Sequence, residues 1–136
     1  MNAPPLLDTH AWIWWLSGDA KLGRENLQAL RRFPRDLRPA ISAISLWEAA
    51  TLVSLGRLEL KTTFDAWLTI AADLGTVRVI PISPQIAAEV TRLPDTFQRD
   101  PADRLIVATS RVHGIPVLTR DKAIVTSGLV RLWSSS

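Results

Sequence analysis

The segment at residues 5–15 constrains the fold most, because a short apolar run meets one carboxylate and then continues as a longer apolar stretch. Leu6 and Leu7 precede Asp8, and the stretch that follows is long enough for a helix. A buried parallel strand that turns into a helix at the edge of a sheet has this pattern. Open α/β sheets bind ligands beyond the carboxyl ends of their strands, so Asp8 is a candidate site residue. An N-cap role in the following helix is the alternative interpretation, and the two roles are compatible.

Strand-like and helix-like segments alternate along the rest of the chain. Short strands are predicted at residues 6–8, 37–42, 77–82, 116–119 and 130–133. Helices are predicted at residues 9–16, 22–32, 45–55, 64–74, 84–92 and 101–113, with a helical turn at 121–126. This order predicts an α/β fold in which a central parallel β-sheet is flanked by α-helices, with right-handed crossovers.

The composition favours a single domain that spans residues 1–136. Hydrophobic residues make up 47% of the chain, which is enough for one buried core. Cysteine is absent, and no membrane span or secretory signal is recognised, so we expect a cytoplasmic protein without disulfides. The net charge of +3 is compatible with a polyanionic partner, although the basic residues are scattered. We expect the six Trp residues in the core, with a partner surface as the alternative for Trp14.

Two acids lie in the first turn of the last long helix. Asp100 fits its N-cap, and capping alone is a sufficient explanation for it. Asp103 is less well explained by the helix, because an apolar run begins two residues later and the helix should be largely buried. A buried carboxylate needs a cationic partner or a metal ion, so Asp103 is a candidate ligand.

Two further acids complete the candidate set. Asp121 follows an apolar strand, as Asp8 does, and its alternative role is the cap of a short helix. Glu48 lies three residues after Ser45, which predicts a capping box at the start of the third helix. That box, or a solvated position on the helix, is the structural alternative to a role for Glu48 in a site.

Carboxylates that converge in one place repel one another, which predicts a divalent cation between them. Mg²⁺ and Mn²⁺ take oxygen ligands of this kind, and Mg²⁺ typically keeps several waters. Such a site activates water and stabilises the charge that develops on a phosphodiester under attack. The predicted catalytic and metal-binding residues are Asp8, Glu48, Asp103 and Asp121, with Asp100 as an additional candidate ligand.

Polar and basic residues beside these acids are candidates for substrate contact. Hydroxyl groups of Thr9, Ser45 and Thr119 would lie at the rim, and Arg99 would lie beside Asp100. Arg104 has an alternative role as the ion-pair partner of the acid four residues before it. The substrate-binding candidates are Thr9, Thr119, Arg104, Arg120 and Lys122. The sequence contains no residues that match a zinc site, a phosphate-binding glycine loop or the nucleophile elbow of a serine hydrolase.

Four stretches together resemble the PIN-domain family, specifically the VapC-like ribonuclease toxins of type II toxin–antitoxin pairs. The stretches occur in the family's order and are residues 6–10, 45–48, 99–109 and 118–122. The resemblance implies a PIN-like fold and a Mg²⁺- or Mn²⁺-dependent endoribonuclease. It also implies inhibition by a cognate antitoxin, a homodimer and a toxin–antitoxin hetero-oligomer.

The resemblance assigns roles to the acids. Asp8, Glu48, Asp103 and Asp121 match the family's first to fourth acids, and no acidic position is missing. Asp100 matches an additional acid in one branch, where either Asp100 or Asp103 contacts the metal directly; we favour Asp103. The RNA target, the cleavage site and the number of metal ions are not given by the sequence.

Two other classes of function are compatible with parts of the pattern. A metal-dependent phosphatase of the haloacid-dehalogenase type needs a second Asp two residues after the first, and His10 stands there instead. A non-catalytic module could use its basic groups to bind nucleic acid or a protein partner. Intact RNA together with tight binding, in the presence of metal, would favour that module.

Overall fold

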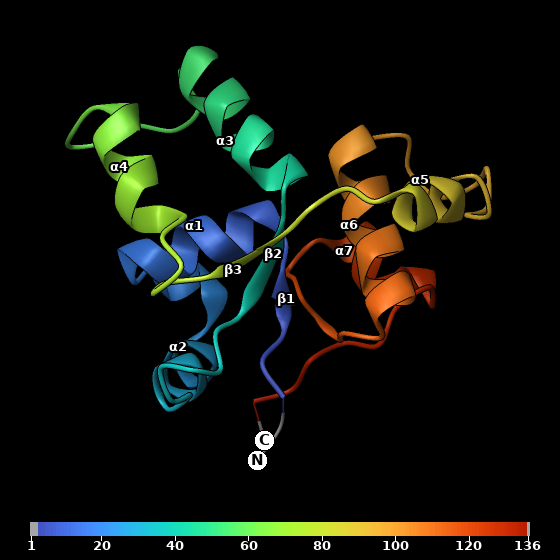
Figure 1. The fold of residues 1–136 in the computed structure, drawn as a ribbon, viewed down its shortest axis with the longest axis horizontal. Helices are drawn as coiled ribbons and strands as arrows, with labels where there is room; N and C mark the ends of the chain where they lie inside the picture. Colours follow the sequence, from blue (N-terminus) through green and yellow to red (C-terminus); the bar gives the residue numbers. More distant parts are fainter. Residues whose placement is uncertain (1–2, 136) are drawn as a thin grey trace.

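A four-stranded parallel sheet runs through the centre of the computed structural model, which describes residues 3–135 (Figure 1). The strand order is β3-β2-β1-β4, and the strands are β1 (Leu6–Leu7), β2 (Ala40–Ser42), β3 (Arg78–Ile80) and β4 (Val117–Leu118). In register, Leu6 lies opposite Ala40 on one side and Val117 on the other. The first strand is therefore an inner strand, and the predicted parallel α/β fold is confirmed.

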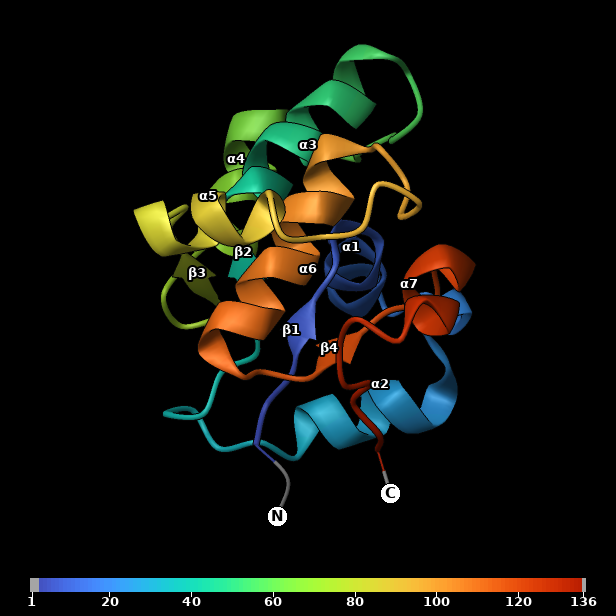
Figure 2. The same cartoon turned by 90° about the vertical axis from the view of Figure 1, so that its right-hand side faces the viewer.

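Helices cover both faces of this sheet (Figure 1). One face carries α1 (Thr9–Ser17), the 3-10 helix η1 (Ala20–Leu22), α2 (Arg24–Arg31), α3 (Ile44–Ser54) and α4 (Phe64–Ala71). The other face carries α5 (Pro84–Val90), α6 (Pro101–His113) and α7 (Lys122–Ser127). Figure 2 views this second face, with α5 and α6 lying over the sheet and α7 beside β4. Among residues 3–135, none of the helices combines the length and hydropathy that crossing a bilayer requires.

The core is divided by the sheet, because successive side chains of a strand point to opposite faces. Leu7 and Ile41 pack with Trp12 of α1 on one face. Leu6 and Val117 pack against the α5–α6 side on the other. The short strands thus lie between two apolar layers. Because both faces of the sheet are buried, the strand sequences are continuous apolar runs.

Several predicted boundaries are wrong at the edges of the elements. Residues 130–133 form one isolated bridge, between Val117 and Leu132, instead of a strand. The fourth helix ends at Ala71 rather than at residue 74, because the Asp73 carboxylate accepts a hydrogen bond from the Gly75 N–H and stabilises a turn. The turn of η1 was not predicted at all.

The predicted capping box on α3 is also wrong. The N-cap of the helix is Ala43, two residues before the predicted cap Ser45, and no side chain forms a capping hydrogen bond there. Ser45 lies inside the first turn and is fully buried, and its hydroxyl pairs with the hydroxyl of Thr9 at 2.8 Å. Ser45 therefore connects α3 to α1, and Glu48 is not occupied by a capping role.

The tryptophans do not all lie in the core. Trp12 and Trp133 are buried, and their indole N–H groups donate to the backbone oxygens of Ala71 and Ala3. Trp47 is 57% exposed, so the core prediction is wrong for it. Trp14 is partly buried.

Candidate active site

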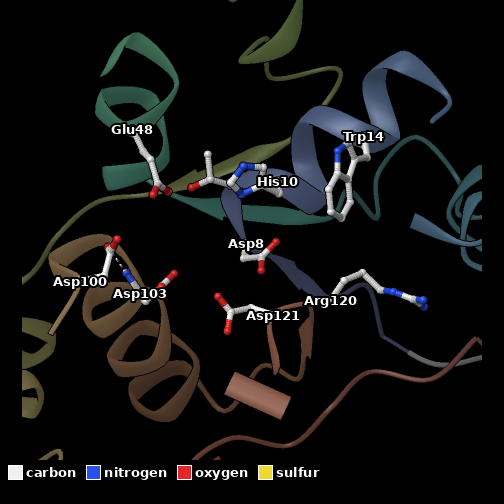
Figure 3. A pocket seen from close by; sticks show the side chains of 9 residues that line it. Asp8, His10, Trp14, Glu48, Asp100, Asp103, Arg120 and Asp121 are labelled. Carbon is white, nitrogen blue, oxygen red and sulfur yellow. Dashed lines mark hydrogen bonds between the residues drawn. The ribbon is translucent and has the colours of Figure 1, made fainter. Parts of the chain in front are cut away.

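Acidic side chains from four elements line one hollow at the carboxyl edge of the sheet (Figure 3). Asp8 follows β1 and Asp121 follows β4, and these strands are neighbours in a parallel sheet, so their carboxyl ends meet. Glu48 enters from α3, which follows β2. The hollow measures about 330 Å³, and its lining residues are Asp8, Thr9, His10, Trp14, Glu48, Asp100, Asp103, Arg120 and Asp121.

Asp8 is both a cap and the innermost acid. Its Oδ1 accepts the backbone N–H of Ala11 at 2.9 Å, which caps α1. Its Oδ2 accepts the hydroxyl of Thr119. The residue is only 6% exposed, and burial is the largest influence on its carboxyl group. Burial raises the pKa of Asp8, and the hydrogen bonds from Thr119 and Ala11 act in the opposite direction.

Thr119 links two of the acids. While its hydroxyl donates to Asp8, its Oγ1 accepts the backbone N–H of Asp121 at 3.0 Å. Asp121 in turn caps α7, because its Oδ1 accepts the N–H of Ala123 at 2.8 Å. The strand-to-helix turn after β4 thus fixes Asp121 relative to Asp8 through one buried hydroxyl.

Glu48 is held beside the same hydroxyl pair that joins α1 and α3. Burial raises the pKa of Glu48, a hydrogen bond from Thr9 lowers it, and the nearby Asp100 raises it. Thr9 itself pairs with Ser45. The hydroxyls that the sequence assigned to the rim are therefore buried supports of the acids.

Asp103 and Asp100 enter from the start of α6. Asp100 caps the helix, since its Oδ1 accepts the N–H groups of Ala102 at 2.9 Å and Asp103 at 3.2 Å (Figure 3). Asp103 lies one turn further in, and its Oδ2 accepts the side-chain N–H of Gln98 at 2.6 Å. The predicted cap, the predicted bounds of this helix and its glycine end are confirmed.

The hollow concentrates negative charge, and in the part of the chain that the structure describes none of its acids forms an ion pair. The ion pairs within residues 3–135 join Arg92 and Arg111 to Glu89, which lies outside the hollow. Burial and the four neighbouring carboxylates, with Asp100 as the strongest of these, raise the pKa of Asp103 to about 7. An uncompensated carboxylate in a half-buried hollow is the situation that a bound cation relieves.

These residues fit a hard divalent cation. The acids supply oxygen donors only, which suits Mg²⁺ and Mn²⁺ better than softer metals. The carboxylates of Asp8, Glu48 and Asp121 point toward the same space in Figure 3. In the part of the chain that the structure describes, no three acidic or imidazole groups already form a ligand set. Ion binding would therefore draw side chains together across the hollow and overcome their repulsion.

The predicted substrate contacts separate into different positions. Thr9 and Arg120 line the hollow, whereas Thr119 lies beneath it as a support and Lys122 is exposed outside its lining. Arg104 lies outside the lining of the hollow, and its predicted contact with substrate stays a prediction. Its guanidinium donates to the backbone oxygens of Phe97, Gln98 and Val90 and forms no ion pair with Asp100. Arg104 thus stabilises the loop before α6.

Three residues at the site were not predicted from the sequence. His10 and Trp14 line the hollow, and Gln98 holds Asp103. The i,i+4 spacing of His10 and Trp14 placed both on one face of the first helix, which was the available signal. Gln98 gave none, because its contact depends on how the preceding loop folds back on α6.

Comparison with known proteins gives a consistent result. The sequence profile of the PIN domain matches residues 6–126. Ribonuclease VapC22 from Mycobacterium tuberculosis (strain ATCC 25618 / H37Rv) is 36% identical over 119 residues, which cover 88% of this chain and 88% of the relative.

Solved structures are similar over nearly the whole chain. A toxin–antitoxin complex from Klebsiella pneumoniae contains a chain with 26% identity and a TM-score of 0.65, covering 97% of this chain and 98% of that chain. The crystal structure of VapBC2 from Rickettsia felis, bound to a DNA fragment from their promoter, contains a chain with 18% identity and a TM-score of 0.66. The second match covers 94% of this chain and 96% of the other, and it supports the fold alone.

Proposed function

The chain belongs to the PIN-domain family, and from this premise we propose that it is a metal-dependent endoribonuclease and the toxin of a toxin–antitoxin pair. The observation that carries the proposal is the group of acids at the carboxyl edge of the sheet. Asp8 is buried, Glu48, Asp103 and Asp121 are partly buried, and Asp100 is exposed. No Lys or Arg among residues 3–135 forms an ion pair with these acids. Its relative is named a ribonuclease, and its structural match a toxin–antitoxin complex, which supports both parts of the proposal.

The divalent ion would be held by Asp8, Glu48, Asp103 and Asp121. Asp100 is an additional candidate ligand, and we favour Asp103 over it for direct contact with the ion. When bound, Mg²⁺ or Mn²⁺ would lower the pKa of a water molecule and neutralise charge on the phosphodiester. We propose these two ions because the donors are all hard oxygen atoms.

The remaining residues orient these acids. Thr119 holds Asp8 and the backbone of Asp121 through one hydroxyl, so it is a positioning residue. Asp103, whose pKa is about 7 in the ion-free protein, holds a proton near neutral pH and would release it when a cation arrives. Arg120, exposed at the lip of the hollow, is the cation best placed to contact an RNA phosphate.

The proposed partners follow from the same comparisons. A cognate antitoxin is proposed because the structural match with 26% identity is a chain of a toxin–antitoxin complex. A homodimer and a hetero-oligomer with the antitoxin remain proposals from the family resemblance. A cytoplasmic location is proposed because that is where an enzyme acting on cellular RNA would find its substrate.

RNA cleavage by purified, antitoxin-free protein tests the proposal. We expect cleavage with Mg²⁺ or Mn²⁺, none with EDTA, and none by the Asp8→Asn variant. Asn preserves the N-cap of α1, so this variant should fold normally. Asp19→Asn is the matched control, because Asp19 caps η1 and does not line the hollow. This variant should cleave RNA as the unmodified chain does.

Two results would contradict the proposal. Full activity of Asp8→Asn would remove Asp8 from the mechanism. Tight binding of RNA that stays intact in the presence of metal would instead support a non-catalytic binding module on the same fold.

A further inference from the structure

The hollow has two chemically different sides (Figure 3). Glu48, Asp100 and Asp103 gather on one side, while Trp14 and Arg120 lie on the other. The acidic side suits a cation, and among the described lining residues it carries no aromatic ring on which a nucleobase could stack. The opposite side supplies aromatic rings and a cation, which are the groups that bind unpaired bases and their phosphates.

His10 and Trp14 form a ring pair on this second side. They are four residues apart on α1, and their ring centroids lie 5.6 Å apart with an interplanar angle of 45°. His10 is exposed and Trp14 is partly buried, whereas Trp12 on the same helix is completely buried. One face of α1 therefore builds the core, and another presents rings to the hollow.

Arg120 completes this side of the hollow. It is exposed, it lines the same space, and it forms no ion pair with a carboxylate in the described part of the chain. Its Nη1 lies 3.9 Å from the position that a Cβ on Gly23 would occupy, so the side chain extends from the hollow toward the start of α2. A strand that leaves the acids past Trp14 would meet this guanidinium next.

We propose that His10 and Trp14 form a subsite for one unpaired nucleobase beside the cleaved phosphodiester, and that Arg120 contacts the phosphate that flanks this base. The inference rests on the proposed ribonuclease function and assigns the contact with an unpaired base to this ring pair. A base can enter a ring subsite only when it is not paired and stacked in a duplex. Stacking is tolerant of sequence, so the subsite selects RNA structure more than base identity.

A purely structural role is the competing explanation for the ring pair. Neighbouring rings at i and i+4 also stabilise an isolated helix. That role requires no contact with RNA, and it predicts that replacing Trp14 changes the stability of the protein without changing its preference among RNA ligands.

Fluorescence anisotropy with short RNA separates the two explanations. The probe is a fluorescein-labelled single-stranded hexanucleotide, compared with a blunt hairpin duplex, both with Mg²⁺ and with Asp8→Asn protein so that the RNA stays intact. Adding Trp14→Ala should weaken single-strand binding by about 10- to 100-fold, the range of one lost base stack, and leave duplex binding unchanged. Trp14→Phe should restore most of the affinity, and Trp47→Ala is the exposed tryptophan control.

Two further changes test the other members of the subsite. His10→Ala should weaken single-strand binding less than Trp14→Ala, because imidazole offers a smaller ring. Arg120→Gln should reduce the slope of log affinity against log salt by about one, as expected for one lost phosphate contact. An abasic position scanned through the hexanucleotide should reproduce the Trp14→Ala loss at one site only.

Several outcomes would overturn the subsite. The subsite is contradicted if Trp14→Ala leaves single-strand affinity unchanged or weakens hairpin and single-strand binding equally. It is also contradicted if Trp14→Phe does not restore binding, or if the Asp8→Asn protein does not bind the single strand. Cleavage kinetics of chains that retain Asp8 separate this failure from failure of the ribonuclease proposal. If the unmodified protein cleaves RNA and Trp14→Ala has the same KM, only the subsite proposal is contradicted. If the unmodified protein does not cleave RNA, the ribonuclease proposal is contradicted.

Discussion

The two edges of the parallel sheet carry opposite charges around hollows of different size. The carboxyl edge has the smaller hollow, about 330 Å³, which is lined by five acids and one Arg. The amino edge, where the chain enters the strands, has a hollow of about 580 Å³ whose charged lining residues are Arg35, Arg38, Arg78 and one acid, Asp36. The larger hollow is the more apolar one, and nothing in its wall resembles a set of metal ligands. Crowding of like charge, rather than size, distinguishes the edge at which we propose the active site.

The difference originates in how helices follow parallel strands. At the carboxyl edge, Asp8 and Asp121 end strands and cap the helices that begin there, and Asp100 caps α6. The N–H groups and the dipole of each helix stabilise a carboxylate at its start. Capping therefore offsets part of the cost of crowding acids together, and a divalent ion would offset the rest. Within residues 3–135, no N-cap residue of a helix lines the hollow at the amino edge.

The largest expected contrast between the edges concerns catalysis. Asp103→Asn should reduce RNA cleavage by at least about 100-fold, because it removes a charge from the ion site, and charge stabilisation by the ion contributes several kcal/mol. Asn can still accept the hydrogen bond from Gln98. Arg78→Gln at the amino edge should leave the initial rate of cleavage unchanged. Equal losses in both variants would break the comparison.

A smaller effect is expected for the hydroxyl that connects two acids. Thr119→Val should reduce cleavage by about 10- to 100-fold, as for other groups that orient metal ligands. It should also destabilise the fold by about 1–3 kcal/mol, because two hydrogen bonds of the Thr119 hydroxyl are lost. One is donated to the Asp8 carboxylate, and the other is accepted from the backbone N–H of Asp121. Urea unfolding and single-turnover cleavage measure the two losses. Thr119→Ser should recover activity; if it does not, the hydroxyl is not responsible.

Ion binding should stabilise one edge only. Mn²⁺ at 100 times its Kd should add about 2.7 kcal/mol to the free energy of unfolding and raise Tm by several degrees. Asp103→Asn should abolish most of this increase, while Arg38→Gln should retain it. A thermal shift that persists in Asp103→Asn would mean that the ion binds elsewhere.

The smallest expected effect is the pH dependence of stability in the ion-free protein. The pKa of Asp103 is raised from 3.8 to about 7, and those of Asp8 and Glu48 are raised as well. Through this range the folded protein holds protons that the unfolded chain releases, so stability falls as pH rises. With EDTA, Tm should be a few degrees lower at pH 7.5 than at pH 5, and Asp103→Asn should reduce the difference. A Tm that rises over this interval would show that these acids are not crowded.

Local sequence patterns were sufficient for the parts of the site that depend on neighbouring residues. The Asp-Pro start and glycine end of α6 fix its bounds, and the apolar pairs before Asp8 and Asp121 fix the strand ends. Contacts between distant residues were not predictable in this way. The Thr9–Ser45 pair overrode an expected capping box, and backbone oxygens of the preceding loop engaged Arg104.

Calorimetric titration of the metal-free protein with Mn²⁺ at pH 7 tests the central claim most directly. We expect binding with release of protons, because Asp103 is partly protonated before the ion arrives. The double variant Asp8→Asn/Asp103→Asn should show neither binding nor proton release, and Arg78→Gln should behave as the unmodified chain. Mn²⁺ binding that is unchanged in the double variant, or absent from the unmodified protein, would contradict a metal site at the carboxyl edge.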